Sequence, residues 1–282
     1  LQKKQMVISK ENKVILAQPW GGLGDNLQYS NLPKLYEDIG KKFYVSHANL
    51  VRNKNIYKFC WQNNPYSNGK IFKKPNIGWK VWIDNLNTFK DRSDCNIIQI
   101  VNLMHGFNEG DGYPSLFINK EIKNNKIKYK YVADLNAITT LPDDEGWSKI
   151  HQEINNYSIT SLSFPGVKKL TSYPNYFKFN EEINLISIED LVEVLSQTDT
   201  FICLTSGSHI LAAGLKNLIG RPNNIISFYP GAEDIDKPHG RYMFNNVEYS
   251  SVGGLKHKPV KDTKLDIYEK IYLKYFWLLF YL

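Results

Sequence analysis

The stretch that decides the fold is QPWGGLGDNLQYSNLPKLYEDIG, residues 18–40. It follows the apolar run 14–17, which predicts a buried strand. Apolar residues then recur at helical spacing between Leu27 and Ile39, so a helix is expected to begin just after the glycines. Strand, glycine turn and helix form a βα unit, whose first helical turn presents unpaired backbone N–H groups to a ligand.

The glycine turn has a functional and a structural interpretation. Gly22 and Gly24 lack a Cβ and so permit close approach by a ligand, and Asp25 follows on the first helical turn. Asp25 is equally suited to capping that helix and to meeting a bound molecule. The turn differs from the dinucleotide fingerprint Gly-x-Gly-x-x-Gly because Leu27 occupies the position of the third glycine. A second motif is therefore needed to decide between the functional and the structural interpretation.

Length, net charge and cysteine number limit the classes of protein to which the chain can belong. The 282 residues suffice for two domains, and 35 Lys and Arg against 28 Asp and Glu give a net charge of +7. The charge is spread over short stretches without a nucleic-acid-binding motif, so we expect no nucleic acid partner but a surface suited to an anionic substrate. Three separated cysteines predict neither a disulfide framework nor a zinc site, and favour a reducing, cytoplasmic location for a soluble protein.

The first half of the chain is expected to alternate strands with helices. Predicted elements are strands at 42–46 and 96–101 and a short helix at 55–61, with a loop over 62–78. His105 follows the predicted strand 96–101 and would project from the same edge as the glycine turn. The lysine-rich residues 119–130 are the candidate interdomain linker.

The second half repeats the alternation. Predicted elements are strands at 129–135, 159–164, 200–204 and 224–229, and helices at 147–155, 188–195 and 207–215. Two such runs predict two doubly wound α/β domains, 1–125 and 126–263, that face each other across a cleft. The apolar residues 264–282 predict a terminal helix that packs back on the first domain, with peripheral membrane contact as the alternative. No apolar run reaches transmembrane length.

The second motif follows the predicted strand 200–204. It reads Thr205-Ser206-Gly207-Ser208-His209 and is expected to begin a helix. Small hydroxylated residues and a glycine at a helix start offer N–H groups and hydroxyls to a phosphate. His209 is a candidate for a further contact with the anion, and a packed or capping side chain is the alternative.

Together the two motifs resemble a known family. GGLGDNLQYSNLP at 21–33 and LTSGSHILAAGL at 204–215 are similar to elements of two-domain glycosyltransferases of the heptosyltransferase type, the family 9-like GT-B enzymes. In that family a Gly-Asp turn opens the acceptor domain, and a Thr/Ser-Gly-x-x-His-Leu-Ala-Ala element opens a helix over the nucleotide diphosphate. The resemblance implies two Rossmann-like domains and an inverting, metal-independent enzyme without a cofactor. Its partners would be a nucleotide sugar and a glycan or glycolipid acceptor.

The resemblance also implies roles for individual residues. Asp25 matches the proposed catalytic base. Candidate donor-binding residues are Thr205, Ser206, Gly207, Ser208 and His209, with Thr139, Thr140, Glu233 and Asp234. Candidate acceptor-binding residues are Gly22, Leu23, Gly24, Asn26, Gln28 and His105. A metal site at Asp234 and Asp236 is the less favoured alternative, because Asp-x-Asp is frequent by chance.

The implied reaction needs few groups. An acceptor hydroxyl attacks the anomeric carbon while Asp25 takes its proton, and N–H donors near residues 206–209 stabilise the leaving diphosphate. One displacement inverts the anomeric centre. The alternatives are a nucleotide-sugar- or glycan-binding GT-B protein without turnover and, less favoured because a third glycine is missing, an NAD(P)-dependent oxidoreductase.

Overall fold

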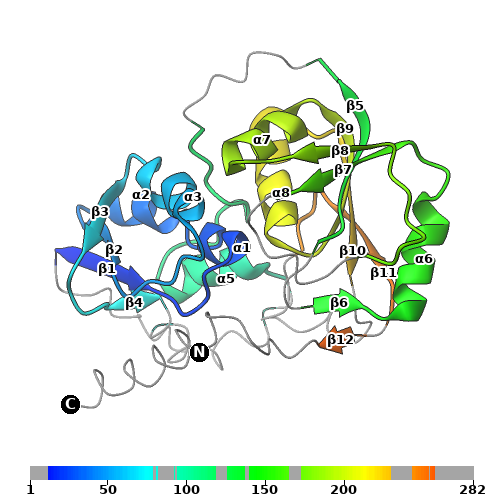
Figure 1. Ribbon diagram of the computed structural model, residues 1–282. Coiled ribbons are helices and arrows are strands. Elements are labelled where there is room, and N and C mark those ends of the chain that lie inside the picture. The colour runs from blue at the N-terminus through cyan, green and yellow to red at the C-terminus, as the bar shows by residue number, and fades with distance from the viewer. Residues whose placement is uncertain are drawn as a thin grey trace.

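The computed structural model contains two parallel sheets that lie side by side, with helices α1 and α8 between them (Figure 1). The structure describes residues 12–78, 81, 92, 94–118, 126–136, 140–164, 173–229, 243–253 and 255–257. The predicted class, α/β with two doubly wound units, is confirmed. The predicted terminal helix 264–282 and most of the candidate linker lie outside the described residues.

The first sheet has four parallel strands in the order β3-β2-β1-β4. They are β1 (Lys13–Ala17), β2 (Lys42–Ser46), β3 (Ser67–Ile71) and β4 (Ile77–Gly78). β3 and β4 fall inside the stretch 62–78, so the predicted loop there is wrong in part. The chain adds β2 and β3 on one side of β1 and then places β4 on the other. The strand order therefore reverses beside β1, where open α/β sheets bind ligands.

Among the described residues, four short α-helices and one π-helix accompany this sheet. They are α1 (Leu23–Leu27), α2 (Leu32–Glu37), α3 (Lys54–Tyr57), the π-helix η1 (Lys58–Gln62) and α5 (Ile97–Met104). The predicted strand 96–101 is wrong, because this segment forms α5. The Asn96 side chain accepts bonds from the N–H groups of Ile98 and Gln99, and Gln99 Oε1 accepts from Asn96 N. This reciprocal capping favours a helix over a strand for the same apolar run.

The second sheet has six parallel strands in the order β11-β10-β9-β5-β7-β8. They are β5 (Tyr129–Asp134), β7 (Ile159–Ser163), β8 (Glu181–Asn184), β9 (Thr198–Leu204), β10 (Asn224–Tyr229) and β11 (Glu248–Ser251). β7 and β8 extend the sheet beyond β5, and β10 and β11 extend it beyond β9. The strand order reverses between β5 and β9, so the carboxyl ends of these two strands define the second switch point.

In the part of the second unit that the structure describes, three helices and a small antiparallel sheet accompany the large sheet. They are α6 (Asp144–Ile154), α7 (Ile188–Ser196) and α8 (Gly207–Ile219), with β6 (Thr140–Pro142) paired to β12 (Leu255–His257). Side chains cap the first two helices: Asp143 accepts from Gly146 N, and Ser187 accepts from Asp190 N. The strands and helices predicted between 129 and 229 are thus confirmed, apart from their ends and the additional β6 and β8.

The two units share one apolar core. It runs without interruption from β1 and β2, through the residues around α5, to the buried face of α8. A Cβ placed on Gly214 would lie 2.7 Å from Pro114 Cγ, so a glycine at this position lets α8 pack directly on the segment after α5. Because apolar burial links both sheets, their facing turns are held in a defined relationship.

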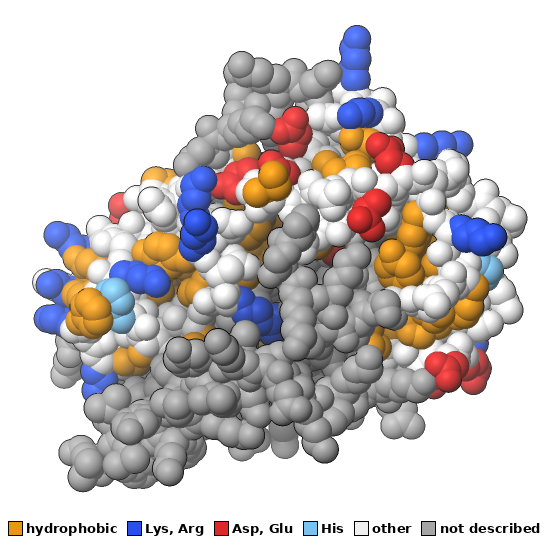
Figure 2. All heavy atoms as spheres, in the orientation of Figure 1, with side chains coloured by type: hydrophobic (Ala, Val, Ile, Leu, Met, Phe, Trp, Pro, Cys, Tyr) orange, Lys and Arg blue, Asp and Glu red, His pale blue; other side chains and the backbone are white. Residues whose placement is uncertain are grey.

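Charge is dispersed over the visible surface. On the face shown in Figure 2, Lys and Arg side chains lie among acidic, apolar and uncharged groups, as the spread of charge along the chain predicts. Among the described residues, none of the helices combines the length and the apolar character needed to cross a bilayer.

Candidate functional site

Asp25 lies on α1, directly after the turn that follows β1. Its Oδ2 accepts a hydrogen bond from Gly22 N at 2.8 Å, so the carboxyl group closes the glycine turn. Burial raises the pKa of Asp25, while the Gly22 N–H and the charge of Arg52 act in the opposite direction. One carboxylate oxygen of Asp25, Oδ2, therefore caps the start of the helix, as the structural interpretation predicts. Within the described residues its Oδ1 makes no hydrogen bond.

Asn26 and Gln28 support the turn from behind. Asn26 is fully buried; its Nδ2 donates to Gly22 O at 2.8 Å, and its Oδ1 accepts from Trp61 Nε1 at 2.9 Å. Gln28 is buried as well, and its Nε2 donates to Asp25 O at 3.0 Å. Both side chains thus make hydrogen bonds to other groups of the protein. We therefore no longer assign them to acceptor binding.

Arg52 is a site residue that sequence reasoning missed. Its backbone N–H donates to Gly21 O at 2.8 Å, and its exposed guanidinium acts on the Asp25 carboxyl. The available signal was its position: Arg52 follows β2, which pairs in parallel with β1. Since the carboxyl ends of parallel neighbours share one edge, a cation soon after β2 is expected near the turn after β1.

The start of α8 is partly exposed. Thr205, Ser206 and Gly207 are half-buried, whereas Ser208 is buried. The Ser206 side chain does not cap the helix; its Oγ lies 2.8 Å from Ser208 Oγ. The N–H groups of this first turn are therefore left without a capping side chain from the N-cap residue, as an anion-binding helix start requires.

His209 is packed inside the protein. It is fully buried, its Nδ1 lies 2.9 Å from Ser206 O, and its Nε2 lies 3.2 Å from Tyr249 Oη. The family element places histidine three residues after glycine, whereas Gly207 and His209 are two apart. The third position is Ile210, which lies against Gly24. The expected contact of His209 with the diphosphate is therefore corrected to a packing role.

Asp134 is the second residue that sequence reasoning missed. It is buried at the carboxyl end of β5, and its register partner on β9 is Cys203. The carboxyl group accepts hydrogen bonds from Asn136 N at 3.2 Å and from Asn136 Nδ2 at 3.0 Å, and burial raises its pKa. An acidic residue immediately after an apolar strand was the signal that could have identified it.

The structure gives little information on the remaining residues that were predicted to bind the donor substrate. Thr139, Glu233 and Asp234 lie outside the described residues, as does the alternative metal ligand Asp236. Thr140 is part of β6, where its backbone is in register with His257 of β12.

His105 does not project from the sheet edge as predicted. It ends α5 and is buried, with Nδ1 2.7 Å from Val101 O and Nε2 3.4 Å from Gly78 N. Burial lowers the pKa of His105 to about 4, so the ring is neutral at physiological pH. The expectation of an acceptor contact rested on a strand at 96–101, and we withdraw it.

The two predicted motifs meet in space. A Cβ on Gly24 would lie 2.9 Å from Ile210 Cδ1 and 3.2 Å from Gly207 Cα. A Cβ on Gly207 would lie 2.8 Å from Gly24 N and 2.9 Å from Leu23 Cβ. The turn at the switch point of the first sheet therefore touches the helix start at the switch point of the second.

Two parallel sheets joined in this way form the fold of the two-domain, family 9-like glycosyltransferases. Two crystal structures of TibC, an iron-containing dodecameric glycosyltransferase from enterotoxigenic E. coli H10407, match with TM-scores of 0.53 and 0.56 at 13% identity. They cover 85% and 89% of this chain, which in turn spans 62% and 66% of theirs. In the second, TibC is a heptosyltransferase in complex with ADP-D-β-D-heptose.

A third structure extends the comparison. The glycosyl transferase family 9 protein of Veillonella parvula DSM 2008 matches with a TM-score of 0.52 at 9% identity, over 91% of this chain and 86% of its own. No protein-family model and no curated protein sequence matches the chain. At these identities the likeness establishes the fold.

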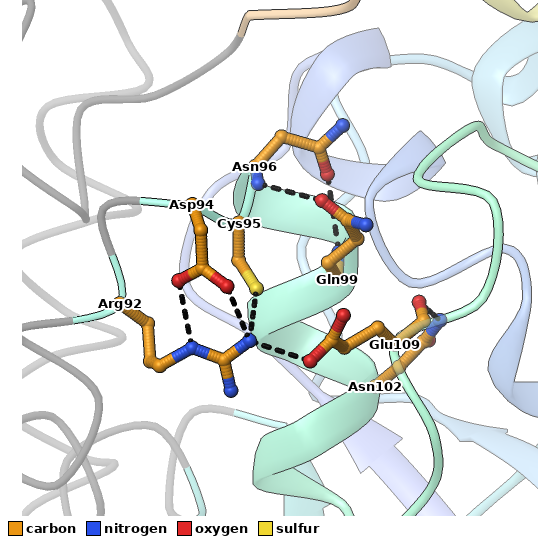
Figure 3. A network of polar contacts seen from close by, with 7 residues as sticks. All are labelled: Arg92, Asp94, Cys95, Asn96, Gln99, Asn102 and Glu109. Atoms are coloured by element: carbon orange, nitrogen blue, oxygen red, sulfur yellow. Dashed lines mark hydrogen bonds and ion pairs between the residues drawn. The ribbon is translucent and has the colours of Figure 1, made fainter.

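Because TibC contains iron, we tested whether residues of this chain fit a metal ion. Within the described ranges, three possible ligands come together only at Asp94, Cys95 and Glu109. Arg92 Nη2 lies 2.8 Å from Asp94 Oδ2, 2.9 Å from Cys95 Sγ and 2.5 Å from Glu109 Oε1 (Figure 3). Burial raises the pKa of Cys95 to about 11, so the thiol stays protonated. The Arg92 guanidinium already binds all three groups, and the residues do not fit a metal ion.

Proposed function

We propose that this protein is a glycosyltransferase that moves a sugar from a nucleoside-diphosphate donor to an acceptor hydroxyl. The observation that carries the proposal is the contact between Gly24 and Gly207, because it brings together two turns of complementary chemistry. One turn carries a carboxylate, and the other carries helix-start N–H groups that the N-cap side chain does not cap. Glycosyl transfer to a hydroxyl requires both a proton acceptor and a site for the departing diphosphate.

Asp25 is proposed as the general base. Its Oδ2 is fixed by Gly22 N, which orients the carboxyl group and leaves Oδ1 to accept the proton of the attacking hydroxyl. Partial burial raises the pKa of Asp25 and so makes it a stronger base than an exposed aspartate. Gly22, Leu23 and Gly24 are proposed to line the acceptor side of the reaction.

The first turn of α8 is proposed to bind the diphosphate. Thr205, Ser206 and Gly207 are its accessible residues, and a helix start favours negative charge. Charge that develops on the leaving diphosphate would be stabilised there, so the reaction as proposed needs no metal. A single displacement by the acceptor inverts the anomeric centre. Thr139, Glu233 and Asp234 stay proposed contacts to the donor.

The comparisons support the substrate class. TibC, which shares the fold, was crystallised with a nucleotide sugar, and a heptose or hexose is the donor sugar that we propose here. A glycan or glycolipid is the proposed acceptor. The chain spans about two thirds of the length of TibC, so the sugar and the acceptor are proposals for this chain.

The experiment is a thermal-shift screen with ADP, UDP, GDP, CDP and dTDP, followed by assay of nucleoside diphosphate release from the matching nucleotide sugar. We expect one nucleotide to raise Tm, since a ligand that binds only the folded state stabilises it. Release that depends on an added glycan acceptor supports the proposal. Binding without release would instead favour a nucleotide-sugar-binding protein, and failure of all five nucleotides would contradict both.

A further inference from the structure

Phe72 is the most exposed large apolar side chain among the described residues, with 84% of its surface exposed. It directly follows β3, and its ring stacks on that of His47, which directly follows β2; the ring centroids lie 3.4 Å apart and the planes differ by 7°. His47 N donates to Ile71 O, and Ser46 Oγ donates to Lys73 O, both at 3.1 Å. Because both neighbours of Phe72 are bonded to the end of β2, the backbone holds the exposed ring in place.

The segment that carries Phe72 is strongly basic. Residues 41–78 contain eight Lys and Arg and no Asp or Glu. The whole chain has 35 Lys and Arg against 28 Asp and Glu, so this segment accounts for the entire excess of positive charge. Lys70, Lys73 and Lys74 lie within two residues of Phe72 and are exposed. At the end of the molecule that carries β3, Figure 2 shows Lys and Arg side chains beside apolar side chains and a histidine.

We propose that the Phe72 surface, formed by His47, Lys70, Phe72, Lys73 and Lys74, binds an anionic lipid bilayer. The lysines are attracted to acidic headgroups, and the phenylalanine ring, which has no polar group, inserts at the boundary between headgroups and acyl chains. A single exposed apolar residue is common on proteins, but this one is fixed in place among cations. An acidic polymer would satisfy the charges alone, whereas a bilayer also covers the ring.

The Phe72 surface lies on the edge of the first sheet that also carries the Asp25 turn. β1, β2 and β3 are parallel neighbours, so the residues that follow them share one edge. Neighbouring strands lie about 4.8 Å apart, which puts the end of β3 about 10 Å along this edge from the end of β1. A bound bilayer would therefore lie beside the proposed acceptor side, within reach of an acceptor that a lipid carries. This consequence alone rests on the proposed function, because bilayer binding needs neither donor nor acceptor.

The first test is co-sedimentation of the full chain with vesicles of phosphatidylcholine, with and without phosphatidylglycerol. We expect binding to the anionic vesicles only, and weaker binding as the salt concentration rises. Phe72→Ala should weaken partitioning about 5- to 10-fold, since the bilayer interface covers part of the ring. Ile186→Ala is the matched control, because Ile186 is 82% exposed on the second unit and its loss should leave binding unchanged.

The second test removes charge from the Phe72 surface. Lys73→Gln combined with Lys74→Gln should weaken partitioning about 10- to 30-fold, because each cation near an anionic bilayer adds its own attraction. Lys130→Gln combined with Lys178→Gln removes the same charge from exposed positions of the second unit and should change partitioning by less than about twofold. All these side chains are exposed, so Tm without vesicles should stay as in wild type.

The third test reports insertion of the ring. Phe72→Trp places an indole at the expected depth in the interface, so the fluorescence that it adds to that of wild type should be quenched by brominated lipids. Ile186→Trp adds an indole at an equally exposed position that we expect to face water, and its added fluorescence should not be quenched.

Other outcomes overturn the inference. Wild type that binds neutral and anionic vesicles equally, or neither, excludes a surface for anionic bilayers. Equal losses in Phe72→Ala and Ile186→Ala show that no particular apolar residue inserts. If the lysine pair matters but Phe72 does not, and the added tryptophan is not quenched, the surface binds acidic groups without insertion and an acidic polymer is its partner. These results are independent of the nucleotide screen, so failure of the proposed function is recognised separately.

Discussion

Gly24 and Gly207 lie in direct contact, and neither position has room for a side chain. The Cβ of an alanine at Gly207 would lie 2.8 Å from the backbone nitrogen of Gly24, closer than real Cβ contacts come. The contact joins a turn of the first sheet to a helix start of the second. Both residues belong to the motifs that the sequence singles out, so the motifs serve the packing of the two units as well as any ligand.

Gly207→Ala should therefore destabilise the protein. Alanine normally favours a helix over glycine, but here its Cβ meets backbone that cannot move alone, and overpacking typically costs about 1–3 kcal/mol. Gly24→Ala should cost less, because its closest contact is the movable end of Ile210. Urea denaturation measures both. Leu218→Ala, an exposed position on α8, is the control, and an equal effect of all three would contradict the close contact.

Asn26 is predicted to be a stability residue. Asn26→Ala removes the buried acceptor of Trp61 Nε1 and one of two donors to Gly22 O, which keeps the backbone N–H of residue 26. Unsatisfied buried polar groups cost about 1–3 kcal/mol each, so the free energy of unfolding should fall by at least that much. The exposed Asn217→Ala should change it by less than about 0.5 kcal/mol. Unchanged stability in Asn26→Ala would show that the turn does not depend on this network.

The wrong and missed assignments have a physical explanation. The apolar run after Asn96 fits a buried strand and a buried helix equally well, and only the Asn96–Gln99 capping pair distinguishes them. The error made His105 a loop residue after a strand, whereas it is the buried residue at the end of α5. By contrast, β1 with its glycine turn and β9 with α8 were predicted because each combines an apolar strand with a glycine at the following turn.

Contacts between segments that are far apart along the chain could not be predicted from the sequence. Arg52 approaches Asp25 because β2 lies beside β1, and Asp134 approaches Cys203 because β5 lies beside β9. Sequence patterns give the type of each element, but not the order of strands in a sheet. Sequence patterns likewise do not predict that His209 is buried, because its contacts with Tyr249 and Phe244 join segments that are far apart in the sequence.

His105 should make stability depend on pH. Its pKa of about 4 in the folded state lies below the ordinary 6.5, so the unfolded chain takes up a proton first as the pH falls. Stability should drop by about 2 kcal/mol between pH 7 and pH 5, and the decline should level off below about pH 4. Urea titrations of wild type and His105→Gln at both pH values measure this effect. An equal loss in the variant would assign the pH dependence to other groups.

Arg52 should set the pH range in which Asp25 can act. Because a general base must be ionised, kcat/KM should rise with pH through the pKa of Asp25, which burial holds above 3.8. The Arg52 charge lowers that pKa, so Arg52→Ala should move the rise to higher pH and reduce kcat/KM most at the acidic end. Arg52→Lys keeps the charge and should shift the profile less. Identical profiles for all three proteins would exclude this role.

The most direct measurement of the central claim, that Asp25 at the meeting point of the two turns is the base of a glycosyl transfer, is a paired assay of Asp25→Asn. Asparagine can still accept the Gly22 N–H bond but cannot take a proton. We predict that acceptor-dependent release of nucleoside diphosphate falls by about 10²-fold or more, while the nucleotide-induced Tm shift stays as in wild type. Turnover that survives in this variant, with the fold intact, would contradict the account.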